Sequence, residues 1–292
     1  MRLRYLLVAT GVFALIAQVL AADCAEWDTP KSFEAATLAE VVECLEPGVD
    51  VNARYEYGHT PLHYAAQNAD NPGVITALLE AGAEVNARSE NGSTPLHFAA
   101  GSTDNPTVIA VLVAAGAEVN ARRGGELKLT PLHYAAWSAD NPGIIAVLVA
   151  AGAEVNARDA YGDTPLHWAI ERNGNPSVIT ALVAVGAEVN TRGRLGLTPL
   201  HLAALLSGDP SVITALVAVG AEVNARGRLD LTPLHYAAAN NDNPAIIEVL
   251  LEAGADVSAR DERGRTPWDF AQDNEVLKGT DAWRRLQEGR LE

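Results

Sequence analysis

The sequence predicts an all-α solenoid of stacked helix–turn–helix units joined by hairpin loops. A heptapeptide that begins Thr60-Pro61-Leu62-His63 returns along the chain, and each copy is followed by a second helix-like segment with its own start and stop signals. The copies lie 34 residues apart, except for one step of 36 residues. They begin at Thr60, Thr94, Thr130, Thr164, Thr198 and Thr232. A fixed period of this length is the signature of a repeat array, in which each unit packs on its neighbours.

The first helix of each unit has clear start signals. Thr60 is a good N-cap residue, because its hydroxyl can accept a hydrogen bond from a backbone N–H of the first turn. Pro61 follows at the first helical position, where a missing N–H carries no penalty. Leu62 and the small residues Ala65 and Ala66 then allow close packing. We therefore expect a short, tightly packed helix after each Thr-Pro pair.

The second helix of each unit is marked by an Asn-Pro or Asp-Pro pair. In the first copy, Asn71 is the expected cap and Pro72 the first helical residue. The apolar stripe that follows has the helical period and consists of Val74, Ile75, Leu78 and Leu79. Gly82 ends the helix, because glycine readily adopts the left-handed C-cap conformation. A loop with a glycine-containing tip then leads to the next Thr-Pro pair.

These features together resemble the ankyrin repeat. The resemblance rests on Thr-Pro-Leu-His-x-Ala-Ala, then a second helix, then Gly-Ala-Glu-Val-Asn-Ala-Arg, and it extends over roughly residues 29 to 292. The repeats are 34 residues long, whereas the family's usual length is about 33. The additional residue falls in the turn between the two helices. The resemblance implies a solenoid whose hairpin tips and concave helix face contact other proteins.

The chain divides into two capping segments around six full repeats. We expect a signal peptide at 1–22, an N-terminal capping repeat at 23–59, repeats at 60–93, 94–129, 130–163, 164–197, 198–231 and 232–265, and a C-terminal capping repeat at 266–292. In the last copy, Trp268 and Asp269 replace leucine and histidine, and Thr280 is the expected cap of a final helix. The apolar face of that helix consists of Ala282, Trp283 and Leu286. An array needs such atypical ends, because an ordinary terminal repeat would expose its apolar face.

The first 22 residues are typical of a secretory leader. A basic start with Arg2 and Arg4 precedes an uncharged apolar run from Tyr5 to Leu20, and Ala21 and Ala22 supply small residues for cleavage. The alternative is an uncleaved N-terminal anchor, since the run is near the lower limit for spanning a bilayer. We expect an exported bacterial protein, either periplasmic or secreted, with no membrane insertion after the leader is removed.

Cys24 and Cys44 are the only two cysteines, and both lie in the N-terminal capping repeat. In an exported chain an even pair predicts a disulfide that fixes the loose end of the array. The alternative is two reduced thiols, which becomes the better interpretation if the leader is not a signal peptide. No Cys-x-x-Cys spacing is present, so a redox role is not expected.

Composition and motifs exclude several classes of function. A formal net charge of −16 disfavours nucleic acids and anionic membranes as partners. The histidines at 63, 97, 133, 167, 201 and 235 recur with the period, and the resemblance implies a structural role in which the ring bonds to backbone or to a capping threonine of an adjacent repeat. The sequence has no catalytic, phosphate-binding or metal-binding motif. We expect no enzymatic activity, no metal and no cofactor.

Function in such a scaffold is expected where otherwise matched copies differ. The hairpin tips and the residues after Ala-Ala vary most, and three tips end in Leu-x-Leu-Thr. The candidate partner-binding residues are Tyr57, Leu127, Leu129, Trp137, Tyr161, Leu195, Leu197, Leu205, Leu206, Leu229 and Leu231. Two alternatives remain: the leucines stack tip on tip, or their similarity records a duplication, because residues 176–190 and 210–224 are identical.

The sequence thus predicts a monomeric, non-catalytic scaffold that binds a protein partner through loop tips and the concave helix face. A passive structural or chaperone-like component of the cell envelope is one alternative, and a host-directed effector is another. The identity of the partner cannot be deduced from these residues.

Overall fold

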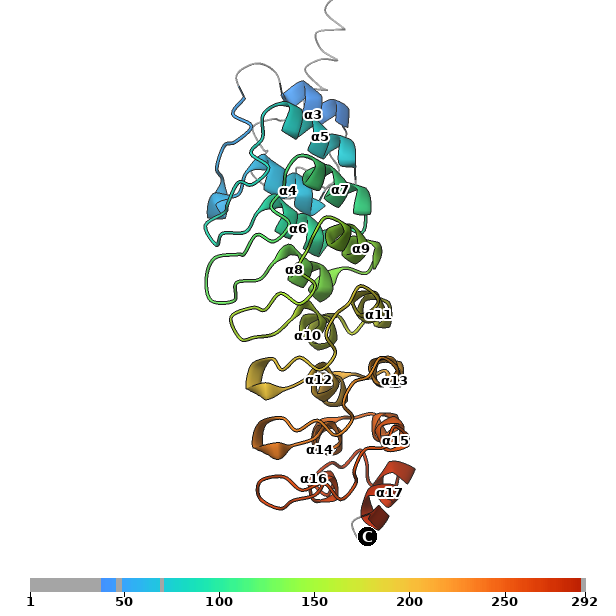
Figure 1. Cartoon of the computed structure of the whole chain (residues 1–292). Helices are drawn as coiled ribbons and strands as arrows, with labels where there is room; N and C mark the ends of the chain where they lie inside the picture. Colours follow the sequence, from blue (N-terminus) through green and yellow to red (C-terminus); the bar gives the residue numbers. More distant parts are fainter. Residues whose placement is uncertain (1–37, 46–48, 69–70, 290–292) are drawn as a thin grey trace, which may run out of the picture.

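The computed structural model describes residues 38–45, 49–68 and 71–289, and the expected signal peptide and Cys24 lie outside these ranges. Two parallel stacks of helices run the length of the molecule, and the hairpin loops project from one side (Figure 1). The described residues contain helices and no strands, as the sequence predicts.

The first helices of the repeats form one stack, at the centre of Figure 1. This stack comprises α4 (Pro61–Asn68), α6 (Pro95–Ser102), α8 (Pro131–Ser138), α10 (Pro165–Trp168), α12 (Pro199–Leu206), α14 (Pro233–Asn240) and α16 (Pro267–Ala271). The second helices form the other stack. It comprises α3 (Leu38–Cys44), α5 (Pro72–Glu80), α7 (Pro106–Ala114), α9 (Gly143–Ala150), α11 (Pro176–Ala184), α13 (Pro210–Ala218), α15 (Pro244–Glu252) and α17 (Asp281–Gly289).

Four short segments interrupt this regularity. The tips at η2 (Glu56–Gly58), η4 (Arg194–Gly196) and η5 (Arg228–Asp230) each form a single 3₁₀ turn. In the fourth full repeat, the π-helical turn η3 (Ala169–Asn173) extends α10 and ends at the left-handed Gly174.

The helix starts follow the cap signals of the sequence. Asn71 Oδ1 accepts a hydrogen bond from the Gly73 N–H at 2.9 Å, so Asn71 caps α5. Gly82, with φ of 94°, follows that helix in the left-handed conformation. At the C-terminal end, the Thr280 hydroxyl accepts from the Trp283 N–H at 3.2 Å, while Leu286 is fully buried.

The core is a continuous apolar layer between the two stacks. In the first repeat, Leu62, Ala65 and Ala66 of α4 and Val74 and Ile75 of α5 have no exposed surface. The equivalent residues of later repeats are buried in the same way, and one cluster extends from Val41 to Leu286. Each repeat therefore covers its neighbours, and the two ends complete the layer.

The six periodic histidines link consecutive repeats. In α6, the Thr94 N–H donates to His97 Nδ1 at 3.1 Å, while the Thr94 hydroxyl lies 2.9 Å from the same nitrogen. Because Nδ1 accepts, Nε2 carries the proton and donates at 3.1 Å to the carbonyl of Leu129, the last residue of the hairpin that leads into the next repeat. The threonine belongs to the histidine's own repeat and not to an adjacent one, which corrects that detail of the sequence analysis.

Asp269 shows why the last copy departs from the pattern. Its Oδ2 accepts from the Thr266 N–H at 2.8 Å and from the Thr266 hydroxyl at 2.9 Å, so it caps α16 as histidine caps the other helices. A carboxylate has no proton to donate to a further carbonyl, and the described residues after α16 form no further hairpin. Aspartate therefore retains the hydrogen bonds that cap α16 and lacks only the bond by which a histidine Nε2 reaches the carbonyl of the next hairpin.

Two further series of hydrogen bonds, made by the side chains of equivalent asparagines and arginines, join neighbouring hairpins along the chain. We call these two series the ladders. Asn86 Nδ2 donates to the Gly116 carbonyl, and its Oδ1 accepts from the Glu118 N–H. Arg88 Nη1 donates both to its own tip at Gly92 O and to Arg122 O of the next repeat. The same two arrangements recur down the array, so the hairpins are fixed in relation to one another.

Lowering the pH from 7.5 to 5 should destabilise the fold. Burial lowers the pKa of His63, His97, His133 and His201 to about 4, against 6.5 in an unfolded chain. The unfolded chain therefore binds more protons between pH 6.5 and 4, and the stabilisation present above pH 6.5 is lost as the pH falls. Each histidine contributes a slope of up to about 1.4 kcal/mol per pH unit, which urea unfolding at several pH values measures.

The control for this prediction is His97→Gln, which removes one titrating ring. Its free energy of unfolding should be lower at pH 7.5 and should fall less steeply with pH. An unfolding free energy that stays constant from pH 7.5 to 5.5 in the parent chain would contradict the role assigned to the histidines.

Candidate functional site

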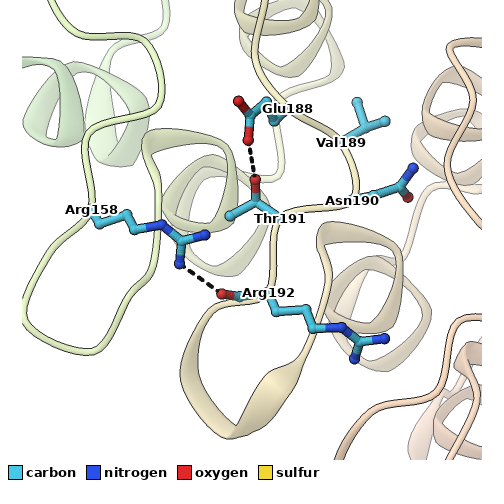
Figure 2. A pocket seen from close by; sticks show the side chains of 6 residues that line it. All are labelled: Arg158, Glu188, Val189, Asn190, Thr191 and Arg192. Atoms are coloured by element: carbon cyan, nitrogen blue, oxygen red, sulfur yellow. Dashed lines mark hydrogen bonds between the residues drawn. The ribbon is translucent and has the colours of Figure 1, made fainter.

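One hollow, of about 560 Å³, is formed by residues at the base of two hairpins (Figure 2). Arg158 donates to the Arg192 carbonyl at 3.0 Å, and Thr191 donates to Glu188 Oε2 at 2.9 Å. Asn190 bridges to the next repeat through Gly220 O and the Glu222 N–H. These polar groups hold the repeats together, so this hollow is a product of the ladders and not our candidate site.

The candidate surface lies instead around the tips and first helices of the fourth and fifth full repeats. A second hollow, of about 260 Å³, opens there between η4 and the end of α12. Its apolar lining consists of Leu195, Leu197, Leu202, Leu205 and Leu206, and its polar lining of Asp163, Glu171 and Arg194. Four of the candidate partner-binding leucines, Leu195, Leu197, Leu205 and Leu206, therefore meet in this hollow.

An ion-pair network borders the hollow. Arg194 Nη2 lies 3.2 Å from Asp163 Oδ2 and 3.1 Å from Glu171 Oε2. The Asp163 side chain is only 3% exposed, and its Oδ1 accepts from the Arg194 N–H at 2.8 Å. A Cβ on Gly193 would collide with this carboxylate, so glycine permits its close approach to the backbone. The arginine head group is thus held by two carboxylates, Asp163 of the preceding repeat and Glu171 of its own repeat.

Aromatic side chains continue this surface toward the third full repeat. The rings of Trp137 and Trp168 lie 5.4 Å apart, and the Arg172 guanidinium lies 6.0 Å from each ring. Arg194 in turn lies 5.3 Å from the ring of Tyr161. We name this connected surface the central patch; its exposed or half-buried members are Trp137, Tyr161, Glu171, Arg172, Arg194, Leu195, Leu205 and Leu206.

Two predicted contact residues are not available to a partner. Leu129 has no exposed surface and Leu197 is only 6% exposed, so the sequence analysis was wrong to place them at a binding surface. Each precedes the threonine that caps the next first helix, and its carbonyl accepts a hydrogen bond from the histidine of the preceding first helix, His97 or His167. That bond draws the residue into the interface between repeats, where its side chain fills the gap as in the stacking alternative.

The remaining predicted residues fall into two groups. Leu229 is 41% exposed at its tip but does not line the hollow, whereas Leu127 and Leu231 are half-buried. Tyr57 is 61% exposed and lies far along the array, beside His59 in a separate hollow. Aromatic residues that follow the histidines pack between repeats; the rings of His97 and Tyr134, for example, lie 5.4 Å apart.

Sequence analysis missed Glu171, Arg172 and Arg194 as members of this site. A signal was present, because the fourth copy reads Ala-Ile-Glu-Arg-Asn-Gly where the other five full copies have Ala-Ala followed by two uncharged residues. The structure shows that this copy forms the π turn η3, which carries Glu171 and Arg172. Such turns are rare and frequently occur at functional sites.

Other kinds of site find no support in the described residues. Over the part of the chain that the structure describes, no three His, Cys, Asp or Glu side chains are grouped so as to hold a metal ion. Among the helices within those same ranges, none combines the length and apolar character needed to cross a bilayer.

Replacing Arg194 with glutamine should lower the free energy of unfolding by about 1 kcal/mol, because Asp163 would lose its charged partner in a buried position. Arg228 occupies the equivalent place one repeat later, where Leu197 and Leu205 replace the two carboxylates, and it forms no ion pair with any described residue. Arg228→Gln should therefore change stability by less than about 0.5 kcal/mol. Equal losses in urea unfolding of the two variants would contradict this assignment.

Comparison with known proteins agrees with the architecture. A family model described as ankyrin repeats (3 copies) matches residues 33–123, 73–159, 123–193, 172–261 and 200–278. The crystal structure of the human ASB11 ankyrin repeat domain is similar with a TM-score of 0.68 and 26% sequence identity, over 79% of this chain and 98% of that chain. No curated protein matches the sequence significantly. Ankyrin repeats generally mediate protein–protein interaction and act as non-catalytic scaffolds. The chain belongs to the ankyrin repeat family.

Proposed function

We propose that this protein is a non-catalytic scaffold that binds a protein partner through the central patch and the neighbouring hairpin tips. One observation carries the proposal. Leu195 and Leu229 are 55% and 41% exposed, and both adopt the left-handed backbone conformation, with φ of 59°. Exposed leucines in this conformation are unfavourable for the free protein on two counts, solvation and backbone strain.

The hairpins do not need this strain. At the equivalent position of other tips, Asn91 and Tyr161 avoid a positive φ, and only the following glycine adopts one. A left-handed non-glycine residue costs about 1–2 kcal/mol. Strain that the fold does not require is typical of ligand-contacting positions, because the constrained residue is already oriented for its contact.

The composition of the central patch supports the same conclusion. Tryptophan, tyrosine and arginine dominate the energetic centres of protein interfaces, and Trp137, Tyr161, Arg172 and Arg194 are such residues. Leu195 and Leu206 border them and are about half exposed. Each leucine buried by a partner contributes roughly 1.5–3 kcal/mol, so a few of them are enough for specific binding.

The proposal includes the cellular context expected from the sequence. The mature chain is exported after cleavage of the leader, acts in the periplasm or outside the cell, and is monomeric. Cys44 is 2% exposed in α3, and a disulfide with Cys24 would secure this helix. These features rest on the leader, the cysteine pair and the acidic composition.

The double variant Leu195→Gly, Leu229→Gly should lose the partner while keeping the fold. Glycine adopts a φ of 59° without strain, so the free energy of unfolding should stay constant or rise by up to about 1 kcal/mol. Binding should weaken at least tenfold, because two exposed apolar side chains are removed. Partner capture by cross-linking and mass spectrometry in the native cell, with the chain tagged at its C-terminus, measures the second effect.

The matched control is Val219→Ser, which removes a 46% exposed apolar side chain after the outer helix α13. It should capture the same partner as the parent chain, whereas Trp137→Ala should lose it. If parent, glycine variant and control all return the same scatter of envelope proteins, the protein is a passive envelope component and the proposed function is wrong.

The proposed export and disulfide are tested by measuring the intact mass of the native protein. The expected mass lacks the leader up to Ala21 or Ala22, and neither cysteine reacts with iodoacetamide before reduction. Cys44→Ser should lower stability by on the order of 3 kcal/mol in the chain-entropy model, which thermal unfolding measures. A retained leader together with two reactive thiols would overturn this part of the proposal.

A further inference from the structure

A third hollow, of about 350 Å³, lies over the N-terminal repeats, away from the central patch. Its walls are aromatic: Tyr57 and His59 come from the first tip, Phe98 from α6 and Tyr134 from α8. Glu90 of the second tip borders the opening. One tip and two first helices thus contribute rings to one site, with a carboxylate at its edge.

His59 is the ring at the centre of this arrangement. Its centroid lies 4.9 Å from that of Phe98 and 6.1 Å from that of Tyr57, and it stacks on His63 at 5.6 Å. Unlike the six periodic histidines, it does not bridge repeats. The Nε2 atom of His59 is buried and forms no hydrogen bond with any described residue.

An unpartnered buried nitrogen is unfavourable, and it therefore needs an explanation. Burial lowers the pKa of His59, although Glu90 and Glu56 oppose this effect. The ring is then neutral near pH 7, and one of its nitrogens is a hydrogen-bond acceptor. A donor placed in the hollow would satisfy Nε2 where the protein itself does not.

The charges around the hollow favour a cation. Glu90 and Glu56 are exposed carboxylates close to Tyr57 and His59. The opposing charge is Arg123, whose Nη1 donates to the Tyr134 hydroxyl at 3.0 Å. Its guanidinium is therefore engaged at the hydroxyl end of the Tyr134 ring, which itself lines the hollow. Aromatic faces attract cations through their electron density, and more strongly so with a carboxylate beside them.

We propose that this hollow binds the ammonium group of a lysine side chain, presented by a basic segment of the partner. The ammonium contacts the faces of Tyr57, Phe98 and Tyr134, donates to His59 Nε2 and pairs with Glu90. A lysine fits because its charge is compact, carries three donors and sits at the end of a long flexible stem. The inference rests on the proposed function only in taking the cation from a protein, since the site itself is separate from the central patch.

The direct test is an NMR titration of the full chain with the peptide acetyl-Ala-Lys-Ala-amide. The aromatic resonances of Tyr57, His59, Phe98 and Tyr134 should shift in a saturable manner. The same peptide with norleucine in place of lysine, which keeps the stem and removes the charge, should leave them unchanged. Equal shifts with both peptides would show an apolar hollow and overturn the cation site, as would the absence of shifts with either.

Three variants measure how much individual side chains contribute to binding of the lysine peptide. Glu90→Gln should weaken lysine binding about threefold, and Tyr57→Leu about fivefold, in line with exposed cation–π pairs. Leucine occupies the equivalent left-handed position at Leu195, so Tyr57→Leu keeps the tip intact. His59→Phe should also weaken binding at least threefold, yet should not destabilise the fold, because it removes the unpartnered nitrogen.

The matched control is Glu84→Gln, which makes the same change of net charge at an exposed ladder position. It should bind the lysine peptide as the parent chain does. Equal weakening by Glu84→Gln and Glu90→Gln would show that only the overall negative charge attracts the peptide, and would overturn the site.

The experiments distinguish a failure of the lysine site from a failure of partner binding by the central patch. If the lysine peptide does not bind but the Leu195→Gly, Leu229→Gly variant loses its partner, the scaffold function stands and the cation site is wrong. If the peptide binds and partner capture is unaffected by that variant, the cation site stands and the central patch is wrong.

Discussion

The bridge from each histidine to the next repeat is the interaction on which the rest of the structure depends. One neutral ring satisfies the cap of its own helix through Nδ1 and holds a carbonyl of the following hairpin through Nε2. Because burial lowers the pKa of these rings, they stay neutral and keep one acceptor and one donor. Local helix initiation and the packing of consecutive repeats are therefore coupled through a single side chain.

This coupling fixes the hairpins and leaves their tips free to vary. The histidine holds the last residue of a tip, while Asn86 and Arg88 and their equivalents hold its base. Residues between these points contribute little to the core, so substitutions there have a small effect on folding. Binding residues are accordingly expected at the tips, on a rigid support that limits the entropy lost when a partner binds.

The central patch and the lysine-binding hollow use this freedom in different ways. Around Arg194 the tip combines apolar side chains with an ion-pair network, and a π turn supplies Glu171. Around His59, rings from three repeats surround an unpartnered nitrogen beside Glu90. A partner that contacts both sites would present an apolar segment and a basic segment, which agrees with the acidic composition of the chain.

The sequence by itself determined the fold class, the position of each helix and the structural role of the histidines. These follow from local cap signals and a fixed period, which each copy repeats. Only the tertiary structure decided which leucine of a Leu-x-Leu tip faces solvent. Leu195 is exposed at the middle of its tip, whereas Leu197 is buried at the end of the same tip, where its carbonyl accepts the bond from His167. It also decided that Arg194 meets Asp163 and Glu171, since contacts between repeats depend on how the units stack and not on any single copy.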